Sequence, residues 1–231
     1  MATINDELKK NAILGIGKKI SEAILQKSEE FQKIFKEMGE AMKFYAKHIP
    51  PSLKRMANHG WYISGDSPMG ESITLAIDLE NGNIEKVDRE LIKYYNGEIR
   101  NIISRVIRSY PERAKILNEA KAAHKNRMYF ASTSLLLSTA DGIFNGLLFK
   151  AKKNKKLLKD HLEKIGHLDD FGMILTEVSA IDAFRRPGKK SDNSLNRHGV
   201  MHGYDVEYGT KLNSLKALSL LAYVCDFFYK K

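Results

Sequence analysis

Arg127 to Lys150 reads RMYFASTSLLLSTADGIFNGLLFK, a run that is apolar on almost every side of a helix. A helix that is hydrophobic all round is buried, whereas a surface helix has one apolar stripe. We therefore predict that this run forms the central helix of an all-α protein. Its one carboxylate, Asp141, needs a partner, because a buried charge is rarely left unpaired.

The sequence downstream of this run also has helical patterns. We predict helices from Leu157 to Ile165 and from Phe171 to Phe184, then a short helix capped by Asp192, Asn193 or Ser194 and stopped by Gly203. Thr210 can cap a final helix. The inner stripe of that helix is predicted to be Leu212, Leu215, Leu218, Leu221, Val224 and Phe228.

The N-terminal part is predicted to be mostly helical as well. Asn5 can cap a long first helix, which Pro50-Pro51 should end. Its apolar positions recur at steps of three or four residues: Ile13, Ile16, Ile20, Ile24, Phe31, Ile34, Phe35, Met38, Met42 and Tyr45. Further predictions are a loop at 61–68, a strand or helical turn at 73–79, a helix at 84–110, and a helix from Pro111 to about Lys125. The pattern as a whole indicates a helical bundle.

The segment Arg197-His198-Gly199-Val200-Met201-His202-Gly203 carries groups suited to phosphodiester chemistry. Arginine is a permanent, fork-shaped cation that binds phosphate, and histidine exchanges protons near neutral pH. Together they can stabilise charge and transfer protons without a metal. His198 and His202 are also spaced to bind a metal from one helical face, but no acidic or cysteine residue lies at a convincing spacing, so we discount zinc.

This segment resembles the C-terminal signature of HEPN-domain proteins, whose pattern is an arginine, usually a polar residue, and a histidine four to six positions further on. The similarity covers NRHGVMHG at 196–203, DVEYGT at 205–210 and NSLKALSLL at 213–221. A second similarity, at Tyr129 to Ile143, is to an upstream helix of uncharacterised relatives. The resemblance implies a HEPN-like bundle at 126–231, preceded by an unrecognised helical region at 1–125 that senses a trigger, binds an inhibitor or completes a dimer.

The resemblance also implies a function, that of a metal-independent endoribonuclease acting as a toxin or antiphage defence effector, with RNA and a cognate antitoxin or sensor protein as partners. His202 would be the general base or acid, and Arg197 would stabilise the charge that develops on the phosphoryl oxygens. Asn196 and His198 would orient the substrate or the motif, and Asp141 would pair with Arg197 or fix the tautomer of His202. No cofactor is expected.

The spacing of Arg197 and His202 poses a geometric problem. Residues five apart are separated by about 140° on an ideal helix, so the two side chains do not meet within one regular helix. Either the helix frays at Gly203, or the motifs of two subunits face each other across a two-fold axis. HEPN relatives are described in the second way, and we expect a homodimer with a composite site.

Tyr204 extends the motif to arginine, four residues, histidine, one residue and tyrosine. This extended pattern resembles that of HEPN toxins paired with a minimal nucleotidyltransferase, in which the tyrosine is modified by the partner. Added phosphates would block RNA by repulsion and bulk. Modification of Tyr204 is therefore a hypothesis.

The net charge of +10, from 38 Lys and Arg against 28 Asp and Glu, favours an anionic partner. The predicted RNA-binding residues form two clusters: Lys152, Lys153, Lys155 and Lys156, and then Arg185, Arg186, Lys189 and Lys190. Such clusters hold a phosphate backbone by salt-sensitive attraction. The alternative is that they are solvated surface and loop.

The remaining features bound the class of protein. A single cysteine, Cys225, excludes an internal disulfide framework, and no apolar run is long enough to span a bilayer. We expect a cytoplasmic protein with no membrane partner. The other five histidines, at positions 48, 59, 124, 161 and 167, are expected to be exposed or near helix ends.

Two other functions remain open. One is a non-catalytic HEPN-like RNA-binding module, which the basic clusters alone would explain. The other is a protein-interaction module in which the stripe from Phe31 to Tyr45 contacts another chain, although such a stripe more often belongs to a core.

Overall fold

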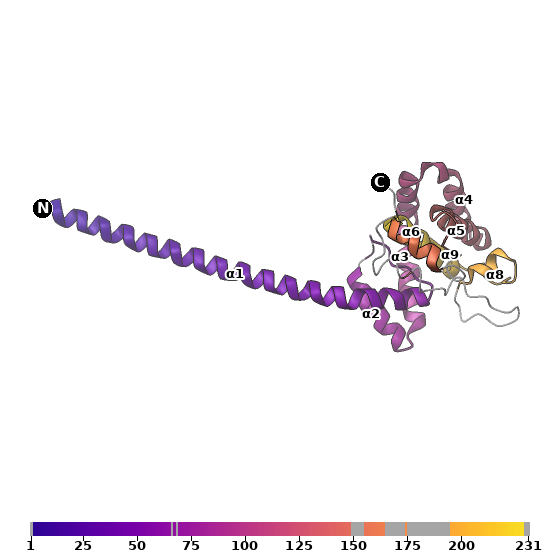
Figure 1. The fold of residues 1–231 in the computed structure, drawn as a ribbon, viewed down its shortest axis with the longest axis horizontal. Coiled ribbons are helices and arrows are strands. Elements are labelled where there is room, and N and C mark those ends of the chain that lie inside the picture. Colours follow the sequence, from indigo (N-terminus) through magenta and orange to yellow (C-terminus); the bar gives the residue numbers. More distant parts are fainter. Residues whose placement is uncertain are drawn as a thin grey trace. The chain divides into compact units, whose positions relative to one another are not determined.

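The structure is a computed structural model that describes residues 2–65, 67, 69–148, 155–164, 174 and 195–228. Within these ranges the regular elements are helices, and no described residue lies in a β-strand (Figure 1). The predicted all-α class is confirmed. The chain divides into two units, Met1–Lys47 and His48–Lys231.

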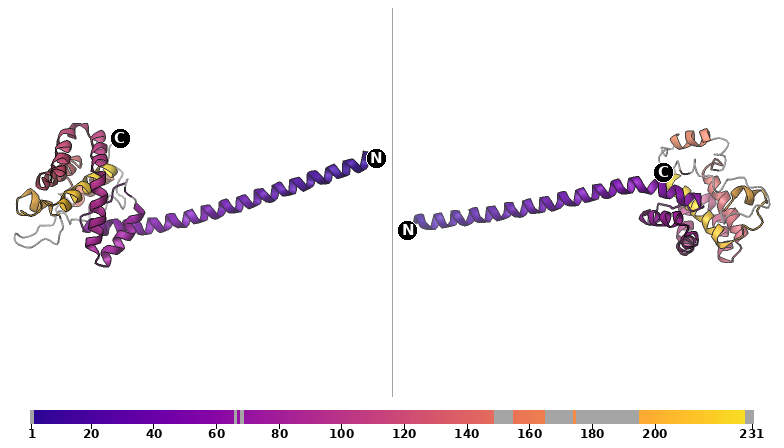
Figure 2. Two further views of the ribbon diagram at one scale, coloured as in Figure 1. Left: turned by 180° about the vertical axis from the view of Figure 1, so that it is seen from behind. Right: turned by 90° about the horizontal axis from the view of Figure 1, so that it is seen from below.

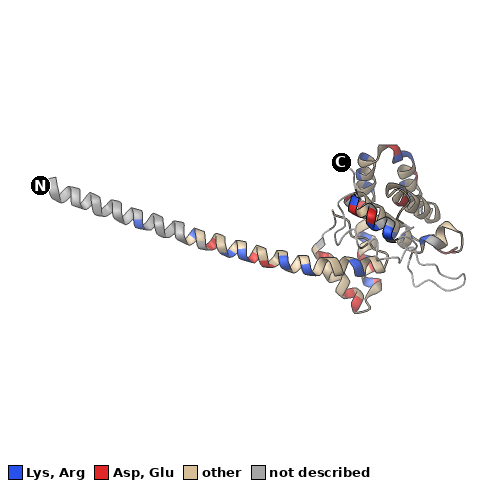
Figure 3. Ribbon diagram, in the orientation of Figure 1, with Lys and Arg blue, Asp and Glu red and all other residues tan. Residues whose placement is uncertain are grey.

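The first unit is part of helix α1, Ala2–Asn58. Its large apolar side chains between positions 31 and 45 are exposed rather than packed in a core, with Phe35 at 68% and Met42 at 69% exposure. Figure 3 shows basic and acidic residues alternating along the same part of α1. The predicted stripe therefore exists, and its described side chains are not covered by any residue that the structure describes.

Pro50 and Pro51 lie inside α1, so the prediction that they end the first helix is wrong. Proline lacks the N–H that an interior helical position needs, but it is tolerated in the first turn of a helix. The boundary between the two units falls just before the prolines. After them, Leu53 and Met56 are buried in the core, and this packing favours a helical conformation up to Asn58.

In the second unit the most deeply buried helix is α9, Lys211–Phe228. Every residue from 214 to 225 is buried, so α9 rather than the 127–150 run is the helix enclosed on all sides. It packs on α5, Tyr129–Ile143, and on α3, Ile84–Ser109, while α4, Ala114–Lys125, packs on α5 (Figure 2). The confirmed cap is Thr210, whose Oγ1 accepts from the Asn213 amide at 3.1 Å.

Helix α5 is shorter than predicted. It ends at Ile143, and the chain then turns through Asn145 and Gly146, whose φ angles are +55° and +69°. This left-handed region is where helices commonly stop, and glycine and asparagine enter it most readily. The break places Asp141 in the last turn of α5.

The other described elements of the second unit are short. They are α2, Met69–Glu80, the 3₁₀ helix η1, Pro111–Arg113, α6, Lys155–Lys164, and α8, Arg197–Met201. The ambiguous run at 73–79 is thus helical, and the predicted helix at 171–184 lies outside the described residues apart from Ile174. One core cluster extends in sequence from Leu53 to Cys225, so the expected boundary between residues 125 and 126 falls inside this unit.

The predicted loop after α1 is present, and residues 61–64 and 67 of it are buried. Its Tyr62 amide donates to Ser219 Oγ at 3.1 Å, and the Tyr62 carbonyl accepts from the Tyr95 hydroxyl at 2.6 Å. Further along, the Gly65 amide donates to Asp226 Oδ2 at 3.0 Å. A buried loop needs such partners for its backbone groups, and here α3 and α9 supply them.

A buried charge pair lies beside this loop. Lys216 of α9 is only 3% exposed, and its Nζ lies 3.7 Å from Asp88 Oδ1. The same oxygen accepts a 2.7 Å hydrogen bond from Trp61 Nε1, and the lysine ammonium lies 5.5 Å from the Trp61 ring centroid. Burial lowers the pKa of Lys216, and Asp88 opposes that shift.

Candidate functional site

Helix α8 carries the Arg197/His202 motif and begins at a side-chain cap. Asn196 is 3% exposed, and its Oδ1 accepts from the Gly199 amide at 3.1 Å while its carbonyl accepts from the Val200 amide at 3.0 Å. This is the N-cap arrangement. The predicted caps Asp192, Asn193 and Ser194 lie outside the described residues, and Asn196, which we expected to orient substrate or the motif, is the observed cap.

The helix ends as the sequence predicts. Gly203 has a φ of +71°, and the Tyr204 and Asp205 amides donate back to the Gly199 carbonyl at 2.8 and 3.1 Å. Gly199 itself has little space, because an added Cβ would lie 3.0 Å from Asp205 Cβ. The two glycines thus hold α8 and its turn in a tight reversal.

Arg197 faces the C-terminal end of α5. Its Nη2 lies 4.0 Å from Asp141 Oδ2, and both side chains are about one-fifth exposed, at 23% and 21%. We expected Asp141 either to pair with Arg197 or to fix the tautomer of His202. The observed contact agrees with the first of these hypotheses. A cation is also favoured at this place because the C-terminal end of a helix carries partial negative charge.

Arg113 is a second guanidinium at the same end of α5, and sequence reasoning missed it. A Cβ added to Gly142 would lie only 2.7 Å from Arg113 Nη1, which shows how closely the arginine approaches the helix backbone. No local pattern links η1 to α8. The one sequence feature that could have indicated this contact is Gly142, because a glycine next to Asp141 leaves room for another group to approach the helix backbone.

His202 lies in the turn after α8 rather than in the helix. The side chain is exposed, and its ring stacks on Tyr204 with centroids 6.1 Å apart and planes at 29°. The angle of about 140° between residues five apart holds only within a regular helix, so it does not describe His202 relative to Arg197. Tyr204 is 52% exposed, and the side chain of His198 lies outside the described residues.

Most of the predicted RNA-binding residues lie outside the part of the chain that the structure describes. Lys156 is exposed on α6, and Lys155 belongs to the same helix. The others, Lys152, Lys153, Arg185, Arg186, Lys189 and Lys190, lie outside the described residues. Among the residues that the structure describes, no group of His, Cys, Asp and Glu is arranged to hold a metal ion.

Replacing Asn196 by alanine should lower the free energy of unfolding by about 1 kcal/mol, the usual effect of losing a helix N-cap. The reason is that the Gly199 amide loses its acceptor within a buried turn. Chemical denaturation monitored by circular dichroism would measure this. Asn196→Asp, which keeps an acceptor oxygen, is the matched control, and equal losses in both variants would contradict the capping role.

Comparison with family models, with curated proteins and with solved structures finds no match to this chain. In the described part of the chain, no helix has the length and apolar character needed to cross a lipid bilayer. The function of this chain must therefore be inferred from the α8 site itself.

Proposed function

We propose that this protein is a metal-independent endoribonuclease whose active site is built on α8 and its turn. The observation that carries the proposal is that α8 and the turn directly after it hold both groups the reaction needs. Arg197 faces the end of α5, where its Nη2 lies 4.0 Å from Asp141 Oδ2, and His202 is exposed in the adjoining turn. In this arrangement Arg197 is a cation with a defined position, and His202 is open to solvent and can exchange protons.

In the proposed reaction the RNA 2′-oxygen bonds to the adjacent phosphorus and the bond from phosphorus to the 5′-oxygen breaks. The proton of the 2′-hydroxyl passes to a base, and the leaving 5′-oxygen takes up a proton. The products are a cyclic phosphate and a free 5′-hydroxyl. His202 transfers protons, and Arg197 stabilises the charge on the phosphoryl oxygens.

The site is proposed to be composite. In a homodimer with two-fold symmetry, the α8 turns of the two subunits would face one cleft, so that the cleft contains two arginines and two histidines. Asp141 is a positioning residue in this scheme, because its Oδ2 lies 4.0 Å from Arg197 Nη2. RNA cleavage of this kind would suit a toxin or antiphage effector with a cognate antitoxin, and exposed Tyr204 is accessible to a modifying partner.

The test is incubation of purified protein with total RNA in EDTA. We expect cleavage that leaves cyclic phosphate ends, no cleavage of DNA, and loss of activity in the Arg197→Ala/His202→Ala double variant. Growth arrest on expression, relieved by the same substitutions, would support the effector role. RNA binding by the wild type without any cleavage would instead identify the non-catalytic RNA-binding module.

A further inference from the structure

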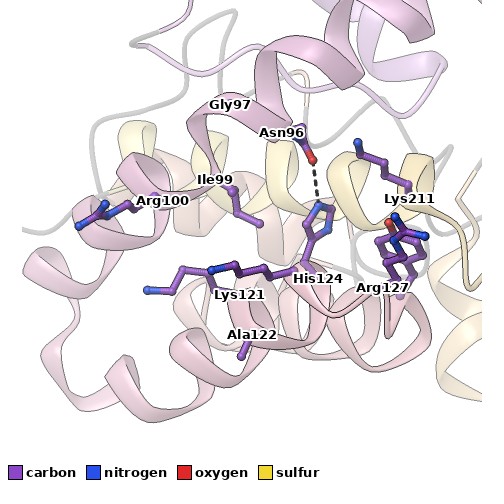
Figure 4. Close-up of a pocket in the computed structure, with 11 residues that line it drawn as sticks. Asn96, Gly97, Ile99, Arg100, Lys121, Ala122, His124, Arg127 and Lys211 are labelled. Carbon is purple, nitrogen blue, oxygen red and sulfur yellow. Dashed lines mark hydrogen bonds between the residues drawn. The ribbon is translucent and has the colours of Figure 1, made fainter.

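A cavity of about 780 Å³ opens between α3, α4 and the N-terminal ends of α5 and α9, away from the motif (Figure 4). Tyr129, which opens α5, lines it, whereas Asp141 lies twelve residues further along that helix. Twelve residues of α-helix span about 18 Å. The cavity is therefore distinct from the α8 site, and its volume is in the range of small-molecule and cofactor pockets.

Five cationic side chains and no carboxylate line this cavity: Arg100, Lys121, Lys125, Arg127 and Lys211. They come from α3, α4, the turn after α4, and α9, so the sequence gives no sign that they belong together. In the whole chain, 28 acidic residues accompany 38 basic ones. A cavity lined by one sign of charge concentrates the field and attracts anions, of which phosphate suits arginine best.

Arg127 adds a second, independent observation. Its φ is +61°, in the left-handed region that a residue with a side chain enters at a cost. The Arg127 amide donates to the His124 carbonyl at 3.0 Å, and the next amide, that of Met128, donates to the Ala123 carbonyl at 2.8 Å. This is the helix-ending turn in which glycine is the usual residue. An arginine here brings a guanidinium to the cavity at the expense of backbone strain, and such strain clusters at functional sites.

His124 contributes a ring that is fixed by hydrogen bonds. It is 5% exposed, and its Nδ1 lies 2.8 Å from Ser214 Oγ, which in turn lies 2.8 Å from Ser132 Oγ. Nε2 lies 3.4 Å from Asn96 Oδ1, the contact drawn in Figure 4. Burial, and then Lys211, lower the pKa of His124. His124 lies in the last turn of α4, near a helix end as expected, and both of its ring nitrogens have partners.

The cavity also offers an aromatic face. Half-buried Tyr129 lines it, with its ring 5.3 Å from the His124 ring in an edge arrangement. Cations beside a partly exposed aromatic ring are a combination that binds single-stranded nucleic acids, in which phosphates contact the cations and bases stack on the ring. We propose that this cavity binds a phosphorylated nucleoside, either as a free nucleotide or as one unit of an RNA strand. This proposal does not depend on cleavage at α8.

The experiment measures binding to a fluorescein-labelled short 2′-O-methyl oligonucleotide, which lacks the free 2′-hydroxyl that the proposed cleavage needs. Fluorescence anisotropy of the full chain is compared with that of Lys121→Ala/Arg127→Gly. A matched control, Lys115→Ala/Arg108→Ala, removes the same charge from exposed positions on α4 and α3 outside the cavity. We expect the cavity variant to raise Kd at least about tenfold and the control to change it much less.

Arg127→Gly alone separates a structural role from a binding role. Glycine relieves the backbone strain, so the variant should unfold at no lower denaturant concentration than the wild type while its Kd for the oligonucleotide rises. Displacement by adenosine 5′-triphosphate that fails in the cavity variant identifies a free nucleotide as ligand. Binding of the oligonucleotide but not of the triphosphate identifies the RNA strand. Equal affinities in cavity and control variants, or no binding of either probe, would overturn the proposal.

Discussion

His202→Ala should lower the rate of RNA cleavage by about 10²- to 10⁴-fold, the usual contribution of a positioned general acid or base. The free energy of unfolding should stay within about 0.5 kcal/mol of the wild-type value, as is usual for a surface substitution. The reason for this separation is that His202 is exposed in the turn after α8 and its ring contacts Tyr204 rather than the core. Cleavage of a fluorogenic RNA and chemical denaturation measure the two effects.

Arg197 provides the contrast. Because its guanidinium lies near Asp141 and is mostly buried, Arg197→Ala should reduce both activity and stability. Tyr204→Phe keeps a ring for His202 to stack on and is the control, with activity close to that of the wild type. If the site is composite, mixing the two inactive alanine variants should restore part of the activity through mixed dimers. Full activity in His202→Ala would remove this histidine from the mechanism.

The end of α8 and the start of α9 could be predicted from the sequence because the signals for them are local. Gly203 stops α8 and Thr210 caps α9 through contacts that span only a few residues. The rule that a charge within an apolar helix needs a partner predicted that Asp141 would have one, but it left Arg197 and His202 open as candidates; the structure places Arg197 Nη2 4.0 Å from Asp141 Oδ2. The roles of these residues in a reaction stay predictions.

The sequence could not reveal features that depend on distant segments. In the sequence, Lys216 is a charged residue outside the predicted apolar stripe of the last helix, and it would be placed on the surface. In the structure α9 is buried from residue 214 to residue 225, and this lysine lies beside Asp88 of α3. The cationic cavity likewise joins side chains from four elements. The prediction that Pro50 ends the first helix was wrong. Proline usually interrupts a helix, but here the packing of the residues after it favours the helical conformation.

Asp88→Ala is expected to lower the free energy of unfolding by about 3–5 kcal/mol, the range for removing one partner of a buried ion pair. Two groups lose their acceptor at once. Lys216, 3% exposed, loses the carboxylate that lies 3.7 Å from its ammonium, and Trp61 Nε1 loses a 2.7 Å hydrogen bond. Trp61 is the single tryptophan, so its fluorescence during denaturation reports on this pair directly.

The matched control is Asp78→Ala, which removes a carboxylate that pairs with Lys86 on the surface at 2.8 Å. It should have a much smaller effect, because exposed ion pairs contribute little. Adding Lys216→Met to Asp88→Ala should recover a large part of the lost stability, since an apolar side chain of similar length replaces a buried charge that has lost the Asp88 carboxylate. Equal stability of Asp88→Ala and Asp78→Ala would contradict the buried pair.

The pH dependence of the Asp88→Ala variant gives a sharper check. Burial lowers the folded-state pKa of Lys216 below the usual lysine value of 10.5, and Asp88 is the group that opposes this shift. Without Asp88 the folded pKa falls further, so between that pKa and the unfolded value the unfolded chain binds more protons than the folded one. Stability then rises with pH in this window. The deficit of Asp88→Ala relative to the wild type should therefore shrink as the pH is raised from roughly 7 towards 10, and it should not shrink in Asp88→Ala/Lys216→Met, which has no amine to titrate.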